Sequence, residues 1–129
     1  MFNTLEIKVI IKVFWRSKLI EDEIQTLLYR FDRLSTKTVT PTRCLILSLL
    51  SYFIDGIQYR ELKAALKISD GKLISNLNQL KTMGYITKTA VKIDKKTIDV
   101  YTLTEKGKKE LNKIIEWTKA IETITNKET

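Results

Sequence analysis

The polar residues that follow Ser69 are spaced so that they would gather on one face of a helix. In SDGKLISNLNQLKTMGYI (69–86), leucines recur at intervals of four and three residues and predict a buried face, formed by Leu73, Leu77 and Leu80. The opposite face would carry small and polar side chains, namely Gly71, Lys72, Ser75, Asn78, Gln79 and Thr82, with Asn76 at its edge. An asparagine or glutamine side chain can form two hydrogen bonds with one adenine, and a lysine can donate to the acceptor atoms of guanine. This face therefore predicts contact with base edges in a DNA groove.

Five of these positions are the candidate base-reading residues. They are Gly71, Lys72, Ser75, Asn76 and Gln79. Gly71 has no side chain, so the start of the helix could approach the DNA closely. The amide side chains favour sites that contain A·T pairs.

A second group of residues is suited to contact phosphates. Two runs that are typical of strands, 85–93 and 98–103, flank the short polar sequence DKKT (94–97), which predicts a hairpin. Lysines lie at its turn and along its first strand, and neutralising phosphates with such cations provides much of the affinity for DNA. The candidate backbone contacts are Arg60, Ser69, Lys88, Lys92, Lys95 and Lys96.

The elements that position these residues are predicted by their caps and their breaks. Thr40 and Pro41 predict the start of an apolar helix that runs to about Phe53, expected to be covered on several sides. Asp55-Gly56 ends it, and a short helix over 60–66 is expected to bury Leu62, Ala65 and Leu66. Lys67-Ile68 is a tight connection, and Ser69 caps the next helix, which ends before Gly84.

The first 40 residues are less uniform in pattern. Residues 5–14 alternate in a way that slightly favours a strand, although Asn3 and Glu6 form a possible capping box that would favour a helix. Helical spacing predicts a helix over 18–34, with Ser17 as its cap, and 35–40 is predicted to be a linker.

The C-terminal region is predicted to be one amphipathic helix capped by Thr104. Its main apolar stripe would be Leu111, Ile114, Ile115, Thr118 and Ile121, with Trp117 and Ile124 on the flank. Together with the helix over 18–34 it could pack within the chain or build a symmetric dimer, and we favour the homodimer. The candidate dimerisation residues are Ile24, Leu28, Phe31, Leu111, Ile114, Trp117 and Ile121.

Composition argues against several classes of function. The formal net charge is +8, which favours a polyanionic partner. One cysteine and no histidine leave no cluster typical of a metal site, no common general base and no disulfide pair, so we expect no cofactor, no enzyme and a reduced, cytoplasmic setting. No apolar run reaches the length of about 18 residues that a membrane span needs.

Four segments together resemble one family, the winged helix-turn-helix regulators of the MarR-like and ArsR-like superfamily. They are PTRCLILSLL, YRELKAAL, SDGKLISNLNQLKTMGYI and YTLTEKGKKEL, and the resemblance covers about residues 41–107. It implies a mainly α fold with a small β-hairpin wing and flanking helices. The resemblance also implies that the third segment is a recognition helix for the major groove and that the wing contacts the minor groove or backbone.

The resulting hypothesis is a small transcriptional regulator that selects sequences in double-stranded DNA. Residues 41–104 would bind DNA, and residues 1–40 and 105–129 would dimerise. The alternative is a winged helix that binds only protein, within a transcription or replication assembly. A cleft between the flanking helices of a dimer could also hold a small effector.

Overall fold

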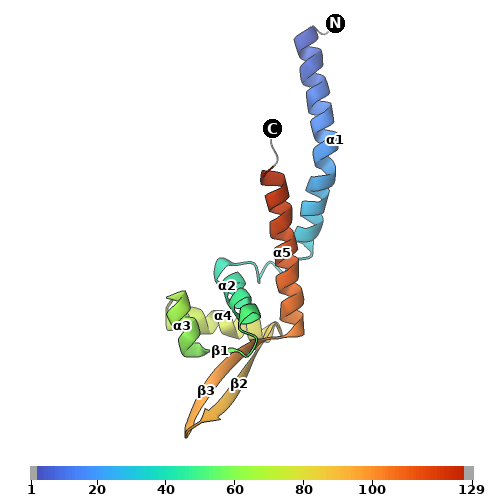
Figure 1. Cartoon of the computed structure of the whole chain (residues 1–129). Coiled ribbons are helices and arrows are strands. Elements are labelled where there is room, and N and C mark those ends of the chain that lie inside the picture. Colours follow the sequence, from blue (N-terminus) through green and yellow to red (C-terminus); the bar gives the residue numbers. More distant parts are fainter. Residues whose placement is uncertain (1–2, 127–129) are drawn as a thin grey trace. The chain divides into compact units, whose positions relative to one another are not determined.

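The computed structural model describes residues 3–126, with only the backbone described over 14–21. This part of the chain contains five α-helices and a three-stranded sheet. Figure 1 labels these elements. The elements are α1 (Thr4–Asp32), α2 (Pro41–Tyr52), β1 (Ile57–Gln58), α3 (Tyr59–Leu66), α4 (Asp70–Thr82), β2 (Ile86–Ile93), β3 (Lys96–Leu103) and α5 (Glu105–Thr125). The predicted fold class, mainly α with a β-hairpin wing, is confirmed. None of the helices described is both long and apolar enough to span a membrane.

The chain divides into two compact units. Unit 1 consists of residues 1–33 and 115–129, and unit 2 of residues 34–114. The helix α5 belongs to both, since its first half packs in unit 2 and its second half in unit 1.

The prediction of a strand over residues 5–14 is wrong, because α1 is helical from Thr4 onward. The capping box decides the outcome: Asn3 Oδ1 accepts from Glu6 N at 2.8 Å, and Glu6 Oε2 accepts from Asn3 N at 3.2 Å. These bonds satisfy backbone groups locally, whereas a strand would need a neighbouring strand to pair with. Ser17 is not a helix start, since it lies inside the continuous backbone of α1.

Within unit 1, the end of α1 runs antiparallel to the second half of α5. Arg30 Nη1 donates to the Glu116 carbonyl at 2.9 Å, and the rings of Phe31 and Trp117 pack at a centroid distance of 6.0 Å. Trp117 is therefore part of the packed face and not of its flank. Ile115, which the predicted stripe included, is 40% exposed.

The core of unit 2 forms around α2 and α4. Thr40 Oγ1 accepts from Arg43 N and caps α2, as predicted, with Pro41 in the first turn. Eight apolar side chains are almost fully buried there, namely Ile46, Leu47, Leu50, Leu62, Leu73, Leu77, Leu80 and Ile86. Two packing predictions are wrong: Ala65 is exposed, and Leu45 and Phe53 are about half exposed, so α2 is covered on one side only.

The sheet of unit 2 contains one strand more than predicted. The order is β1-β3-β2, with both pairs antiparallel, and the two residues of β1 pair with Tyr101 and Val100. Figure 1 shows β2 and β3 as a hairpin that projects beyond α2, α3 and α4. Its turn is Asp94-Lys95, both with positive φ (48° and 66°), so Lys96 begins β3 and is not a turn residue. A two-residue turn of this kind matches the natural twist of a hairpin.

Candidate nucleic-acid interface

The N-cap of α4 and its buried leucines determine which face of the helix is exposed. Ser69 Oγ accepts from Lys72 N at 3.2 Å and caps the helix, as predicted. The side chains of Leu73, Leu77 and Leu80 are at most 1% exposed, which fixes the rotation of the helix against the core. The opposite face is exposed as predicted, at Gly71, Lys72, Ser75, Asn78, Gln79 and Thr82.

Polar contacts fix the connection between α3 and α4. Lys67 adopts the left-handed conformation at φ 53°, which allows the tight turn. Asp70, the first residue of α4, accepts from Tyr59 Oη at 2.6 Å and pairs with Lys63 Nζ at 2.6 Å. Hydrogen bonds from Lys63 and then Tyr59 lower the pKa of Asp70, and the bond to Asp70 raises the pKa of Tyr59 to about 12. The two helices are therefore tied at the start of α4.

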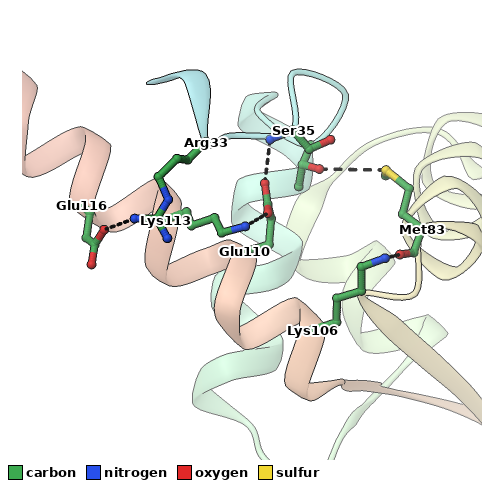
Figure 2. A network of polar contacts seen from close by, with 8 residues as sticks. Arg33, Ser35, Met83, Lys106, Glu110, Lys113 and Glu116 are labelled. Carbon is green, nitrogen blue, oxygen red and sulfur yellow. Dashed lines mark hydrogen bonds and ion pairs between the residues drawn. The ribbon is translucent and has the colours of Figure 1, made fainter. Parts of the chain in front are cut away.

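The far end of α4 is held by residues that precede and begin α5. Gly84 has φ +81°, the left-handed conformation expected after a helix. Figure 2 shows Lys106 reaching back to α4, where its Nζ donates to the Met83 carbonyl at 2.9 Å. Thr104 Oγ1 donates to the Gly84 carbonyl and accepts from Gly107 N, so it also caps α5.

The linker 35–40 is tied to α5 by a buried carboxylate. Glu110 is 4% exposed, and its Oε1 accepts from Ser35 N at 2.9 Å. Lys113 Nζ lies 3.8 Å from the other carboxylate oxygen. Figure 2 shows these contacts together with Lys106 and Met83, so the linker and the end of α4 are both attached to the first turns of α5.

Asn76 differs from the other predicted base-reading residues. It is half-buried, and both atoms of its amide already have partners: Arg43 Nε donates to Oδ1 at 2.9 Å, and Nδ2 donates to the Lys72 carbonyl at 2.8 Å. Sequence reasoning missed Arg43, because its partner lies 33 positions away and no local pattern links them.

The wing, residues 86–103, presents cations at its tip and along one face. Lys92, Lys95 and Lys96 are exposed, and none of them forms an ion pair with another described residue. Lys88 instead pairs with Asp99 at 3.4 Å, which offsets part of its charge. The opposite face of β2 is unexpectedly apolar, with Val91 and Ile93 at 38% and 50% exposure.

A hollow of about 440 Å³ lies between the start of α3 and the wing. Its lining includes Tyr59 and Arg60 at the start of α3, and residues 96–99 of β3. Arg60 and Lys96, two of the predicted phosphate contacts, therefore line the same depression.

The charge of the chain divides unequally between the two units. Unit 2 contains 15 lysines and arginines against seven acidic residues, a net charge of +8. Unit 1 contains eight of each, a net charge of zero. Unit 2, which contains α4 and the wing, thus accounts for the whole excess of positive charge.

The candidate dimerisation residues have unequal exposure. Ile24, Leu28 and Phe31 are 40–50% exposed, Trp117 and Ile121 are half-buried, and Leu111 and Ile114 are buried in the single chain. The predicted dimerisation region, residues 1–40, also contains the start of α1, from which no individual candidate residue was named. The start of α1 exposes Leu5, Ile7, Val9, Ile10, Ile11 and Val13, each by 46% or more.

No group of three or more potential metal ligands lies close together among the described residues. Unit 1 contains a cavity of about 290 Å³ between α1 and α5, lined by Asp22, Glu23, Thr26, Arg30, Ala120, Thr123 and Ile124. This cavity lies between the flanking helices of one chain, and nothing in its lining specifies a ligand, so the effector stays a prediction.

Comparisons with known proteins agree with this architecture. A family model described as a winged helix DNA-binding domain matches residues 42–121. A search of curated protein sequences gave no significant match. The structure is similar to that of the YusO protein from Bacillus subtilis, at 17% identity and a TM-score of 0.63, with 97% of this chain and 84% of that one covered.

Two further solved structures share the fold. One is a MarR-family transcriptional regulator from Rhodococcus, at 13% identity and a TM-score of 0.58, with 88% of this chain and 77% of that one covered. The other is S. aureus MepR in complex with DNA, at 18% identity and a TM-score of 0.57, with 88% and 86% covered.

Proposed function

Since the chain belongs to the winged helix DNA-binding domain family, we propose that it is a transcriptional regulator that binds double-stranded DNA through unit 2. The observation that carries the proposal is the coincidence of two features on one unit: the whole charge excess of +8, and a helix whose exposed face is small, polar and free of acidic side chains. A helix in the major groove needs such a face, and phosphates need such a charge.

In the proposed complex, α4 enters the major groove and the wing lies along the minor groove or the backbone. Lys72, Ser75 and Gln79 are exposed and read base edges, while Gly71 allows close approach. Arg60, Ser69, Lys92, Lys95 and Lys96 contact phosphates, and Lys88 contributes less because Asp99 is its partner. The proposal contains no catalytic step and no cofactor, and a regulator of this kind would act in the cytoplasm.

The test is duplex binding measured by fluorescence anisotropy between roughly 50 and 300 mM salt. The wing variant Lys95→Ala/Lys96→Ala should flatten the log–log salt slope by up to about two, because each neutralised phosphate contributes about 0.9. The matched control is Lys8→Ala/Lys12→Ala, which removes the same charge from exposed positions of α1 in unit 1. Equal slopes for the wing and control variants would contradict the proposal.

We further propose that unit 1 forms a homodimer. The support is the exposed apolar side chains at the start of α1, where Leu5 is 70% exposed, Val9 54% and Val13 56%, together with Leu28 near its end at 50%, since exposed apolar side chains gathered in this way are usually covered by a partner. A second copy would place two α4 helices on half-sites about one helical turn apart.

Light scattering should give twice the chain mass of 15.0 kDa for the wild type. Val9→Lys/Leu28→Lys should shift the mass towards 15.0 kDa, whereas Lys8→Ala/Lys12→Ala should not. A monomeric wild type at micromolar concentration would contradict the dimer but not DNA binding by unit 2.

A further inference from the structure

Arg43, in the first turn of α2, connects three parts of unit 2. Its backbone N–H donates to Thr40 Oγ1, Nη1 donates to the Lys37 carbonyl in the linker, and Nε donates to Asn76 Oδ1 on α4. The side chain is half-buried, so this arrangement is held partly out of water. A planar guanidinium can bond both the linker and α4 in fixed directions, which a lysine ammonium cannot do equally well.

These contacts determine which way the Asn76 amide faces. A guanidinium only donates and a backbone carbonyl only accepts, so Oδ1 must face Arg43 and Nδ2 must face the Lys72 carbonyl. Reading an adenine requires Oδ1 and Nδ2 to be aimed together at the base edge. In this structure Oδ1 is directed towards Arg43 on α2, and Nδ2 is directed back along α4 towards Lys72.

The neighbours of Asn76 on α4 form no comparable side-chain hydrogen bonds with other described residues. Ser75 and Gln79 are exposed, whereas Asn76 is half-buried at the edge of the same face. Of the amide side chains on or beside this face, Asn76 is therefore the one that the fold keeps occupied, whereas Asn78 and Gln79 are exposed.

We propose that Arg43 is a positioning residue that sets the base preference of α4 by holding the Asn76 amide away from the DNA. The inference rests on the DNA-binding function proposed above. Base reading then falls to Lys72, Ser75 and Gln79, and Asn76 reads a base only when Arg43 is removed.

The experiment is a selection from a randomised duplex library, followed by affinities for the selected site with each base pair changed in turn. It compares the wild type with Asn76→Ala, Arg43→Met and the double variant. Methionine keeps an unbranched apolar stem but cannot donate to Asn76. Lys81→Met serves as the control for loss of one charge, because Lys81 is an exposed residue of α4 without a contact to Asn76.

Asn76→Ala should select the wild-type site with unchanged discrimination at every position. Arg43→Met should gain a preference for an A·T pair at one further position, of about tenfold. The double variant should lose that preference again. Both Arg43→Met and Lys81→Met should lose some affinity for all duplexes, so the readout is base preference rather than affinity.

Two results would overturn the inference while leaving DNA binding intact. One is a loss of tenfold or more in discrimination at any position in Asn76→Ala; the other is a folded Arg43→Met variant that selects the wild-type site. If Arg43→Met does not fold, Asn76→Ala alone decides. Failure of the wild type to bind any duplex would instead refute the proposed function, and this inference with it.

A measurement on the free protein tests the contact itself. Hydrogen exchange of the Arg43 Nε–H, followed by NMR, should be slow in the wild type and should accelerate about tenfold or more in Asn76→Ala, because the acceptor at 2.9 Å is lost. An equal exchange rate in both proteins would show that Arg43 does not hold Asn76 in solution.

Discussion

Replacing Gly107 by alanine should destabilise the protein, although alanine is the better helix former. Gly107 lies in the first turn of α5, where its backbone N–H donates to Thr104 Oγ1. A Cβ placed there would lie 2.1 Å from the Tyr85 carbonyl oxygen and 2.7 Å from Leu103 Cδ1. Real Cβ atoms are essentially never found under 3.0 Å, so the Tyr85 carbonyl and the start of α5 would have to move apart by about 0.9 Å (3.0 less 2.1).

The magnitude follows from three effects. Forcing extra volume into a packed site costs about 1–3 kcal/mol. The Tyr85 carbonyl also accepts from Thr104 N at 3.0 Å, and a shift of that size would break this bond at a cost of about 1 kcal/mol. The higher helix propensity of alanine than of glycine offsets about 1 kcal/mol of these costs. The free energy of unfolding should therefore fall by about 1–3 kcal/mol.

Gly71→Ala is the matched control, since Gly71 also lies in a helix but a Cβ there would meet nothing within 4 Å. It should stabilise the protein by up to about 1 kcal/mol, while weakening duplex binding because its methyl group would face the DNA. Thermal unfolding followed by circular dichroism should lower Tm for Gly107→Ala by roughly 4 °C per kcal/mol and raise it slightly for Gly71→Ala. A Tm of Gly107→Ala equal to or above that of the wild type would refute this packing argument.

Four further predictions concern unit 2. Glu110→Ala should lower the free energy of unfolding by about 1–3 kcal/mol in urea, because it leaves the Ser35 N–H without its acceptor; no change would mean that the buried contact is not formed. Leu77→Ala should cost about 2–5 kcal/mol because Leu77 is 1% exposed, and Leu45→Ala, at 48% exposure, should cost much less; equal losses would contradict the described core. Asp70→Asn should reduce stability by its full amount above the ordinary Asp pKa of 3.8, because the wild-type carboxylate is stabilised there by its lowered pKa. The difference should shrink below pH 3.8 and disappear as the pH falls through the lowered value, and a stability difference that persists in stronger acid would contradict the contact. The same contact predicts that the Tyr59 phenol contributes stability below pH 10 that is lost as the pH rises through about 12, and Tyr59→Phe should remove that late step from an ultraviolet titration.

Local signals were enough to predict most of unit 2. Thr40, Ser69 and Gly84 mark the limits of α2 and α4 because caps and left-handed stops act within a few residues. The leucine spacing of α4 likewise fixes its exposed face, because one helix repeats every 3.6 residues.

Features that depend on contacts between residues distant in the sequence could not be predicted. The strand β1 has only two residues and exists because it pairs with Tyr101 and Val100, far along the chain. The hydrogen bond between Arg43 and Asn76 is equally non-local, so sequence alone placed Asn76 among the base readers. At residues 5–14, β-branched composition outweighed the capping box in the prediction, although the capping box gave the right answer.

The most direct test of the central proposal is to map the surface that DNA covers. The measurement is a ¹H–¹⁵N NMR titration of the labelled protein with a short duplex. The proposal predicts shift changes concentrated at the exposed positions of α4, at Arg60 and along the wing to Lys96, with α1 unaffected. Shift changes confined to α1, or to the exposed Tyr52-Phe53-Ile54 segment at the end of α2, would contradict binding through α4 and the wing.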